Sequence, residues 1–229
     1  MKIFLDTADI EEIRIAARWG VLDGVTTNPS LFAKTTGKTY DEVLTEICGI
    51  TPGPVSAEVV AEHVDEMLEE GRHFAKLAPN IVVKVPMSEE GLEAIYRFAE
   101  EGIKTNCTLI FTANQGLLAA KAGASLLSPF VGRLDDINQD GMDVIRELVT
   151  IVEVHDLDTE VLAASIRHPR HMTDAAMLGA HIATTPFKIL QMMVHHPLTD
   201  SGITKFREDW DTARQIAEAN AKAAASRHN

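Results

Sequence analysis

The chain contains little cysteine and no long apolar stretch. Its 229 residues include only Cys48 and Cys107, whose separation matches neither a disulfide framework nor the ligand spacing of a metal site. Cys107 falls in a predicted buried strand, where a thiol serves as a small apolar group. No apolar run approaches the roughly 20 residues of a membrane span, and Asp6 and Asp9 interrupt the region where a secretory signal would be apolar. We therefore expect a protein of the reducing cytoplasm with no membrane partner.

The chain also has few basic residues for its acidic ones, since 21 lysines and arginines stand against 34 aspartates and glutamates, a formal net charge of −13. Nucleic acids and anionic membranes bind basic surfaces, so neither is an expected partner. A phosphorylated metabolite remains compatible with this charge. A phosphate site needs only a local group of arginine, hydroxyl and backbone N–H donors.

A Pro/Ser-rich linker, a low-complexity tract and a short internal repeat are missing as well. We therefore expect residues 1–229 to form a single domain with one large core. What the sequence does contain is a series of eight strand-like runs, each followed by a helix-like stretch. The strand-like runs are 3–7, 24–28, 55–60, 81–86, 105–111, 126–131, 161–165 and 181–186.

The helix-like stretches carry apolar residues at helical spacing, and they lie at 9–19, 40–47, 62–77, 89–100, 114–121, 141–154, 170–178 and 186–194. Four glycines follow such stretches where a helix C-cap is expected, at Gly20, Gly102, Gly123 and Gly179. The segment 39–51 has the least clear pattern. A further amphipathic segment, at about 204–225, predicts an additional C-terminal helix.

Alternating strand and helix units indicate an α/β protein with a parallel sheet. Eight such units in a chain of this length favour a closed (β/α)8 TIM barrel with an additional C-terminal helix. An open doubly wound sheet is the alternative, but its Gly-x-Gly-x-x-Gly fingerprint is absent after the first strand-like run. In a barrel, side chains from the C-terminal ends of the strands converge on one site.

Lys84 lies inside the apolar run 81–86, which ends in proline and is predicted to be a buried strand. Removing an ammonium group from water costs free energy unless the group is paired or loses its proton, and the neutral amine is a nucleophile. Two structural alternatives are a buried ion pair and a side chain that extends past the strand end to water.

Most of the other strand-like runs also carry a polar group in an apolar frame. The candidates for a shared site are Asp6, Asn28, Glu58, Asn106, Thr108 and Ser128. Asn106 and Thr108 are two residues apart and so share a face, as do Ser128 and Phe130. A single central site explains this distribution. Local alternatives exist, since Asn28 precedes a proline as in an ordinary turn and Thr108 is a common strand residue.

Arg133, Ser165 and Arg167 follow two neighbouring strand-like runs near the end of the series. Loops at this position in barrels often bind phosphate, and these three side chains are suitable donors. Each arginine alone would be an ordinary solvated charge, and Ser165 alone could cap the next helix. Together they predict a phosphate site.

Four segments resemble the motifs of one enzyme family. Residues 25–30 (Val-Thr-Thr-Asn-Pro-Ser) resemble the Thr-x-Asn-Pro-Ser signature of transaldolases, and residues 81–86 resemble their Schiff-base strand. Residues 128–133 (Ser-Pro-Phe-Val-Gly-Arg) and 163–167 (Ala-Ala-Ser-Ile-Arg) are similar to two further family segments. The similarity extends from Met1 to the region of Trp210. The chain is close in length to the compact subfamily that also contains fructose-6-phosphate aldolases.

The resemblance implies a class I aldol mechanism that uses neither a metal nor a cofactor. Lys84 would form a Schiff base with a ketose phosphate, sedoheptulose 7-phosphate or fructose 6-phosphate. Asp6 would take the proton from the hydroxyl whose carbon becomes the departing aldehyde. The three-carbon dihydroxyacetone unit would remain on Lys84 as an enamine until glyceraldehyde 3-phosphate or erythrose 4-phosphate accepts it, so the kinetics should be ping-pong.

The resemblance also implies roles for the other candidates. Glu58 and Thr108 would hold a water molecule that relays protons. The hydroxyls of the three-carbon unit would be bound by Asn28 and Asn106, with Ser128 in contact on the face of Phe130. The phosphate would be bound by Arg133, Ser165 and Arg167, which would orient the reacting bond.

The same family includes a competing activity, that of fructose-6-phosphate aldolases, which release free dihydroxyacetone. Those aldolases carry glutamine at the position of Glu58 and tyrosine at that of Phe130, so this chain has the transaldolase residue at both. A sugar-phosphate-binding barrel without catalysis would leave Lys84 only an electrostatic role, and no other feature supports a pyridoxal-phosphate lysine. The family further implies sugar-phosphate partners, a homo-oligomer that is typically a decamer, and the pentose phosphate pathway.

Overall fold

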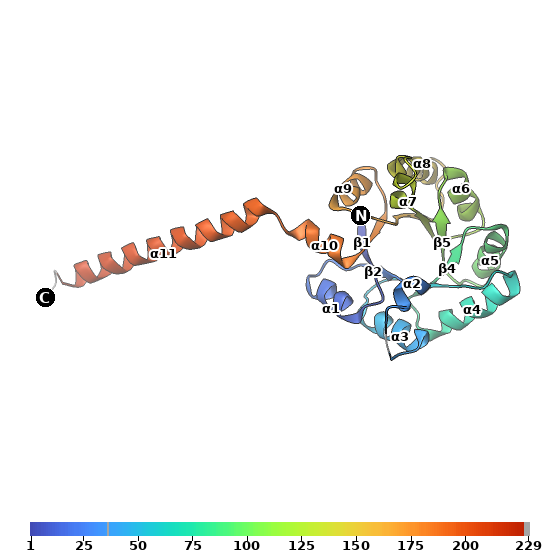
Figure 1. Cartoon of the computed structure of the whole chain (residues 1–229), viewed down its shortest axis with the longest axis horizontal. Coiled ribbons are helices and arrows are strands. Elements are labelled where there is room, and N and C mark those ends of the chain that lie inside the picture. The colour runs from blue at the N-terminus through green and yellow to red at the C-terminus, as the bar shows by residue number, and fades with distance from the viewer. Residues whose placement is uncertain (36, 227–229) are drawn as a thin grey trace. The chain divides into compact units, whose positions relative to one another are not determined.

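The computed structural model describes residues 1–35 and 37–226, and within them eight parallel strands close into a barrel (Figure 1). Each strand pairs with the next in chain order, and β8 closes the barrel against β1. The strands are β1 (Lys2–Asp6), β2 (Gly24–Thr26), β3 (Val55–Glu58), β4 (Ile81–Pro86), β5 (Thr105–Ile110), β6 (Leu126–Pro129), β7 (Glu160–Ala163) and β8 (Ile182–Thr185). The predicted (β/α)8 architecture is confirmed.

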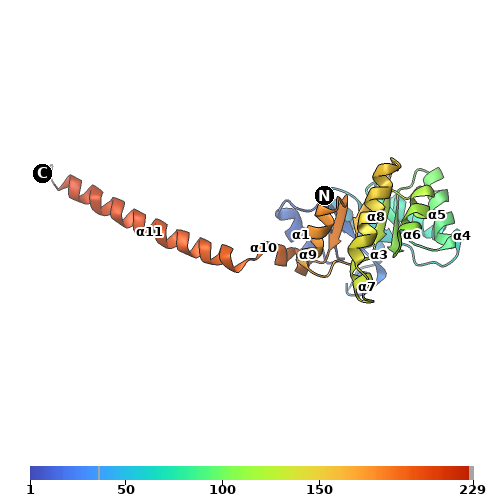
Figure 2. The ribbon, with the colours of Figure 1, turned by 90° about the horizontal axis from the view of Figure 1, so that it is seen from above.

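Helices alternate with the strands, and Figure 2 shows α4, α5, α6 and α8 running along the outside of the barrel. The helices are α1 (Ile10–Arg18), α2 (Pro29–Phe32), α3 (Tyr40–Ile50), α4 (Val64–Leu77), α5 (Glu89–Glu100), α6 (Ala113–Lys121), α7 (Val131–Asp135), α8 (Gly141–Val154), α9 (Pro169–Met177), α10 (Phe187–Val194) and α11 (Pro197–Ala225).

Local sequence signals account for several helix ends. α3, whose pattern is the least clear in the sequence, begins with a capping box in which Thr39 and Glu42 each bond the other's backbone N–H. Four helix C-termini are followed by a glycine with a positive φ, the conformation that glycine adopts without steric strain. These residues are the predicted Gly20, Gly102, Gly123 and Gly179, with φ of 72°, 71°, 99° and 82°.

Two short helices, α2 and α7, differ from the sequence prediction because four or five residues are too few to show an apolar period. Asn28 caps α2 by accepting a hydrogen bond from the Leu31 N–H at 3.0 Å, and Pro29 occupies the first helical position. β2 therefore ends at Thr26, earlier than predicted. α11 begins at Pro197 rather than near residue 204, since proline also suits a first turn.

The internal contacts of the chain define two compact units, Met1–Leu190 and Gln191–Asn229. In the second unit, Ile203, Phe206 and Trp210 recur at spacings of three and four residues and so share one face of α11. No helix within the described residues is long and apolar enough to span a membrane. That the whole chain forms one domain stays a prediction.

The apolar core of the first unit consists of two clusters. Side chains alternate between the two sides of a strand, so neighbours such as Phe4 and Leu5 belong to different clusters. Leu5 joins the large cluster between the strands and the surrounding helices. The smaller cluster fills the barrel interior, with Phe130 packed against it, and consists of Phe4, Val82, Leu126, Leu162, Ala164 and Ile182. This inner cluster forms the floor of the site described next.

Candidate active site

Polar side chains continue the interior face of the barrel beyond the inner apolar cluster. Residues two apart on a strand share a face, so on β1 the carboxylate of Asp6 follows the ring of Phe4. On β4, in the same way, Lys84 follows Val82. The alternation of the strands therefore directs an acid and an amine toward the same space.

Lys84 is 6 % exposed, and its Nζ donates to Glu58 Oε2 at 2.8 Å and to the backbone carbonyl of Thr27 at 3.2 Å. Glu58 and Lys84 are register partners on β3 and β4, so their side chains leave the sheet on the same side. The lysine is therefore in a buried ion pair, one of the two structural alternatives, and it also lines a cavity. A carboxylate at this distance can accept a proton from the ammonium group.

A cavity of about 270 Å³ adjoins the Lys84 amine. It brings together most of the predicted site residues, namely Asp6, Asn28, Lys84, Ser128, Phe130, Arg133, Ser165 and Arg167. Five further lining residues were not predicted as part of the site, namely Thr26, Ala164, Ile166, Thr184 and Pro186. The predicted residues Glu58, Asn106 and Thr108 are not among those that line it.

Asp6 is the second carboxylate near the amine. Its Oδ1 accepts a hydrogen bond from the Thr26 hydroxyl at 2.7 Å, and the hydroxyls of Thr26 and Thr184 are 2.7 Å apart. Burial raises the pKa of Asp6, while the charge of Lys84, the Thr26 hydroxyl and the charge of Lys34 act in the opposite direction. A carboxylate with a raised pKa is a stronger proton acceptor. The position of Thr26 and Thr184 near strand ends is the one sequence feature that points to them, but threonine is too common in strands to stand out.

Asn106 is fully buried in the barrel interior. Its side-chain amide donates to Ser56 Oγ at 3.0 Å, and its Oδ1 accepts from the Ser128 hydroxyl at 2.7 Å. Asn106 therefore fixes the position of Ser128, which lines the cavity. Direct binding of a substrate hydroxyl by Asn106 stays a prediction.

Thr108 lies within an irregularity of β5, where the register with β6 shifts between Cys107 and Ile110. Leu109 has a φ of 58°, in the left-handed region that residues other than glycine rarely adopt. Thr108 Oγ1 is fully buried and, within residues 1–35 and 37–226, has no hydrogen-bond partner. Such a hydroxyl is suited to bind a water molecule. The water predicted between Thr108 and Glu58 stays a prediction.

Two arginines lie at the other end of the cavity, in different surroundings. Arg133, on α7, holds its guanidinium 5.0 Å from the centre of the Phe130 ring, within the range of a cation–π contact. Arg167 instead forms an ion pair, in which its Nη2 donates to Asp136 Oδ2 at 2.8 Å. A phosphate that binds Arg167 therefore competes with this carboxylate.

The loop that carries Ser165 and Arg167 is held against Gly132. Ser165 has a φ of 59°, and its carbonyl accepts a hydrogen bond from the Gly132 N–H at 3.1 Å. A Cβ at Gly132 would lie 2.3 Å from the Ser165 carbonyl oxygen and 2.6 Å from Arg167 Nε. Only glycine allows this close approach. Ser165, Arg167 and Arg133 all line the cavity. That the three bind a phosphate stays a prediction.

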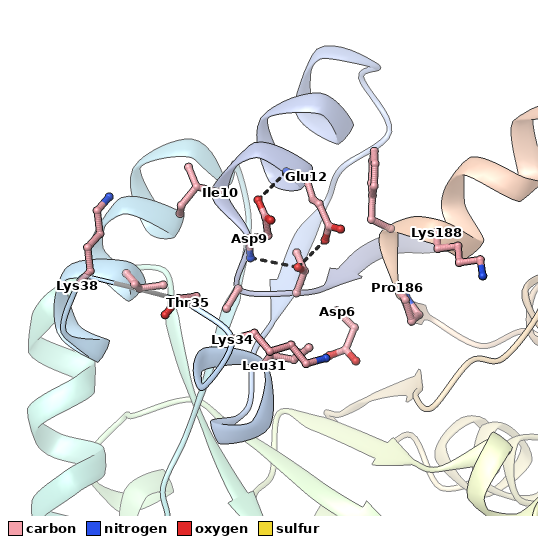
Figure 3. A pocket seen from close by; sticks show the side chains of 14 residues that line it. Asp6, Asp9, Ile10, Glu12, Leu31, Lys34, Thr35, Lys38, Pro186 and Lys188 are labelled. Atoms are coloured by element: carbon pink, nitrogen blue, oxygen red, sulfur yellow. Dashed lines mark hydrogen bonds between the residues drawn. The ribbon is translucent and has the colours of Figure 1, made fainter.

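A second cavity, of about 510 Å³, meets the first at Asp6 and Pro186, which line both (Figure 3). Figure 3 shows Lys34 extending toward Asp6 from the turn that follows α2. The lysines of this larger cavity are exposed, in contrast to Lys84, and they are Lys34, Lys38 and Lys188. The buried amine that is paired with a carboxylate therefore belongs to the smaller cavity.

His171 contacts the loop that carries Arg167. His171 Nε2 lies 3.0 Å from Asp135 Oδ2, and its Nδ1 accepts the Arg167 N–H at 3.4 Å. Burial lowers the pKa of His171, and the charge of His168 acts in the same direction. Among the described residues, no three histidine, cysteine, aspartate or glutamate side chains are grouped so that they could hold a metal ion.

Comparison with known proteins agrees with the motifs. Residues 3–228 match the family described as transaldolase/fructose-6-phosphate aldolase. A probable transaldolase of Herpetosiphon aurantiacus is 60 % identical over 222 residues, which cover 95 % of this chain and 100 % of the relative. One of Alkaliphilus metalliredigens is 57 % identical over 211 residues, 92 % of this chain and 98 % of the relative.

Among solved structures, a thiamine phosphate pyrophosphorylase from Pyrococcus furiosus is similar, with a TM-score of 0.56 and 14 % identity. The match covers 81 % of this chain and 85 % of that one. At this identity the likeness concerns the fold alone. The family match and the two relatives, in contrast, extend over nearly the whole sequence. The chain belongs to the transaldolase/fructose-6-phosphate aldolase family.

Proposed function

We propose that the chain is a transaldolase that moves a dihydroxyacetone unit from sedoheptulose 7-phosphate or fructose 6-phosphate to glyceraldehyde 3-phosphate or erythrose 4-phosphate. One observation carries the proposal. The buried Lys84 amine, 2.8 Å from the Glu58 carboxylate, lines the same cavity as Asp6 and two arginines. A nucleophile, a base and two arginines that can bind phosphate thus line one small cavity, and a proton acceptor, Glu58, bonds the nucleophile from behind it. The name of the relatives, probable transaldolase, supports the same activity.

Schiff-base formation begins with proton transfer from the Lys84 ammonium to Glu58. The free amine attacks the ketone carbon of the substrate, and one proton moves from the positively charged nitrogen to the ketone oxygen, which gives a neutral carbinolamine. The carbinolamine loses its hydroxyl as water, with a proton from Glu58, and an iminium remains. A carboxylate is suited to this sequence because it acts as base and acid in turn. The Thr27 carbonyl, 3.2 Å from Nζ, orients the amine.

Carbon–carbon cleavage follows at the bond between the third and fourth carbons of the ketose. Asp6 removes the proton from the hydroxyl on the fourth carbon, and the electron pair of the breaking bond moves to the iminium. The departing fragment is an aldose phosphate, and the three-carbon unit stays on Lys84 as an enamine. The same steps in reverse join this unit to a second aldose phosphate.

The phosphate of donor and acceptor binds at the far end of the cavity, to Arg133, Ser165 and Arg167. Guanidinium groups bind phosphate oxygens through charge-assisted hydrogen bonds, which position the reacting carbons over Lys84 and Asp6. Both aldose phosphates present the same phosphate group, so one site serves both halves of the reaction.

Fructose-6-phosphate aldolase activity is the second candidate, because the matching family includes it. The side chains of Glu58 and Phe130 favour transfer instead, because fructose-6-phosphate aldolases carry glutamine and tyrosine at these positions. Phe130 presents only an apolar ring to the cavity, so it cannot position water or donate a proton to the enamine. The enamine therefore persists until an aldehyde arrives.

The proposal includes a setting for the enzyme. It works in the cytoplasm, in the pentose phosphate pathway, on sugar phosphates and without a metal or cofactor, as the family implies. The net charge of −13 argues against nucleic acid or anionic membrane as a partner. A homo-oligomer, a decamer by resemblance, is supported by the apolar face of α11 that carries Ile203, Phe206 and Trp210, because one helix cannot bury its own face.

A two-substrate assay tests the activity. Fructose 6-phosphate is supplied with or without erythrose 4-phosphate, and both sedoheptulose 7-phosphate and free dihydroxyacetone are measured. We expect formation of sedoheptulose 7-phosphate to exceed release of dihydroxyacetone by at least about a hundredfold when acceptor is present. Release that is equally fast with and without acceptor would identify an aldolase, and no turnover in either assay would overturn the proposal.

A further inference from the structure

The hydrogen-bond ladder between β2 and β3 is interrupted next to the reactive amine. The Thr27 N–H donates to the Ser56 carbonyl at 3.1 Å, which extends the parallel pattern one residue past β2. The next bond of a parallel ladder would join the Glu58 N–H to the Thr27 carbonyl. In this described segment the two groups have other partners. The Glu58 N–H donates to the Tyr40 hydroxyl at 3.3 Å, and the Thr27 carbonyl accepts from Lys84 at 3.2 Å.

The hydrogen-bond directions of the Thr27 and Tyr40 hydroxyls follow from the number of protons that each group can donate. The Thr27 hydroxyl donates its single proton to the Ser56 carbonyl at 2.8 Å. The Tyr40 hydroxyl, 3.1 Å from Thr27 Oγ1, must then donate to that oxygen while it accepts from the Glu58 N–H. Burial raises the pKa of Tyr40, so the phenol keeps the proton that it donates. Every donor has an acceptor, and the Thr27 carbonyl remains for Lys84.

Packing fixes the phenol from outside the barrel. Tyr40 is the first residue of α3, directly after the capping box at Thr39. Its ring lies 5.0 Å from that of Phe32 and 5.5 Å, edge to face, from that of Phe74. Aromatic contacts of this kind restrict a ring to one orientation. The hydroxyl is therefore held at the ends of β2 and β3 by residues that lie outside the cavity.

We propose that Tyr40 is a positioning residue for the Lys84 amine. Its hydroxyl takes the place of a backbone carbonyl as partner of the Glu58 N–H, which fixes Glu58 and frees the Thr27 carbonyl to bind the amine. Without the hydroxyl, the Glu58 N–H and the Lys84 ammonium compete for that carbonyl. This inference rests on the proposed role of Lys84 as the nucleophile.

Tyr40→Phe removes the hydroxyl and keeps the ring. A matched control is Tyr96→Phe, since Tyr96 is the second of the two tyrosines and donates to Glu100 at 2.9 Å on the exposed face of α5. We expect Tyr40→Phe to lower kcat and the rate of borohydride trapping with fructose 6-phosphate about tenfold each. Competitive inhibition by inorganic phosphate, which reports on the distant arginines, should be unchanged. Tyr96→Phe should match the wild-type chain in all three.

A second variant, Thr27→Val, removes the hydroxyl that receives the Tyr40 proton. If the hydroxyls act as one unit, Tyr40→Phe combined with Thr27→Val is trapped no more slowly than the slower single variant. Fully additive losses would contradict the chain of hydrogen bonds. Should Tyr40→Phe fail to fold, Thr27→Val decides alone, and trapping at the wild-type rate overturns the inference.

The wild-type protein separates the two levels of the proposal. If borohydride with fructose 6-phosphate leaves no adduct on Lys84 in the wild-type chain, the proposed function fails. If the wild-type chain is trapped at Lys84 and Tyr40→Phe is trapped equally fast, only the role of Tyr40 fails.

Discussion

The two ends of the cavity hold their charges in opposite ways. At one end Lys84 is 6 % exposed and bonded at 2.8 Å to Glu58 on the neighbouring strand. At the other, the ion pair of Arg167 and Asp136 is formed by side chains that are 51 % and 59 % exposed. An exposed pair of this kind contributes only about 0–1 kcal/mol, so a phosphate can replace Asp136. Strands thus fix Lys84 and Glu58, while the loop after β7 presents an arginine that can exchange partners.

The largest effect should come from removing the amine at the buried end. Lys84→Met keeps most of the side-chain volume and eliminates the nucleophile, so we expect transfer to fall about a thousandfold or more. Inorganic phosphate should still bind with unchanged affinity, as isothermal calorimetry can measure, because the arginines are untouched. Residual transfer above about one part in a thousand would count against covalent catalysis.

Asp6→Asn should divide the reaction into its two halves. The amide cannot take the hydroxyl proton, so cleavage should fall about a hundredfold or more while Schiff-base formation continues. Mass spectrometry after borohydride reduction should then find the intact six-carbon sugar phosphate on the protein, rather than a three-carbon unit. Loss of both the adduct and cleavage would reject the assigned role of Asp6.

Gly132→Ala tests the end of the cavity that carries Arg167. Its Cβ would lie 2.3 Å from the Ser165 carbonyl oxygen, so the loop that carries Arg167 must move. We expect KM for fructose 6-phosphate to rise about tenfold or more, since remote phosphate contacts orient the substrate. Trapping with unphosphorylated dihydroxyacetone, which needs only Lys84 and its neighbours, should continue at the wild-type rate. A comparison of the two rates in one preparation provides the control.

Asp136→Asn should act on the same end in the opposite direction. It removes the carboxylate that pairs with Arg167, so KM for fructose 6-phosphate should fall about two- to fivefold, as expected for an exposed ion pair. The difference should shrink at high salt, because salt screens exposed charges. An unchanged or higher KM would show that Asp136 orients Arg167 rather than competing for it.

The smallest effect concerns stability and pH. Burial raises the pKa of Asp6 above 3.8, so the unfolded chain ionises at lower pH than the folded one. Ionisation of Asp6 therefore lowers the free energy of unfolding as the pH rises from the pKa of Asp6 in the unfolded chain to its pKa in the folded chain. Asp6→Asn cannot ionise, and we expect its unfolding temperature to exceed that of the wild-type chain at neutral pH, with the gap closing in acid. A gap that is independent of pH would contradict this sign.

The sequence predicts the barrel well because its strand-like runs and its helix-ending glycines indicate the same fold. Apolar runs bounded by proline or glycine mark the strands, and four glycines mark helix ends at the positions where the structure has positive φ. α2 and α7 are missed because they are shorter than the period that reveals a helix. Both helices matter for the site, since α7 carries Arg133 and α2 follows directly on Asn28.

The sequence predicts which residues form the site better than it predicts the contacts between them. Lys84, Asp6 and the arginines stand out as charges near strand ends, where a barrel gathers them. The bond between Glu58 and Lys84 depends on the register of β3 and β4, which a single sequence does not encode locally. Tyr40 gave no signal because it lies in the segment with the least clear pattern, and its hydroxyl reaches Glu58 only through packing.

Peptide mapping after borohydride reduction addresses the covalent step most directly. The wild-type chain is incubated with fructose 6-phosphate, reduced, digested and analysed by mass spectrometry, with and without prior addition of erythrose 4-phosphate. We expect a reduced three-carbon adduct on Lys84 alone, and its disappearance when the acceptor is added first. An adduct on Lys34 or another lysine, or none at all, would contradict the assignment of Lys84 as the nucleophile.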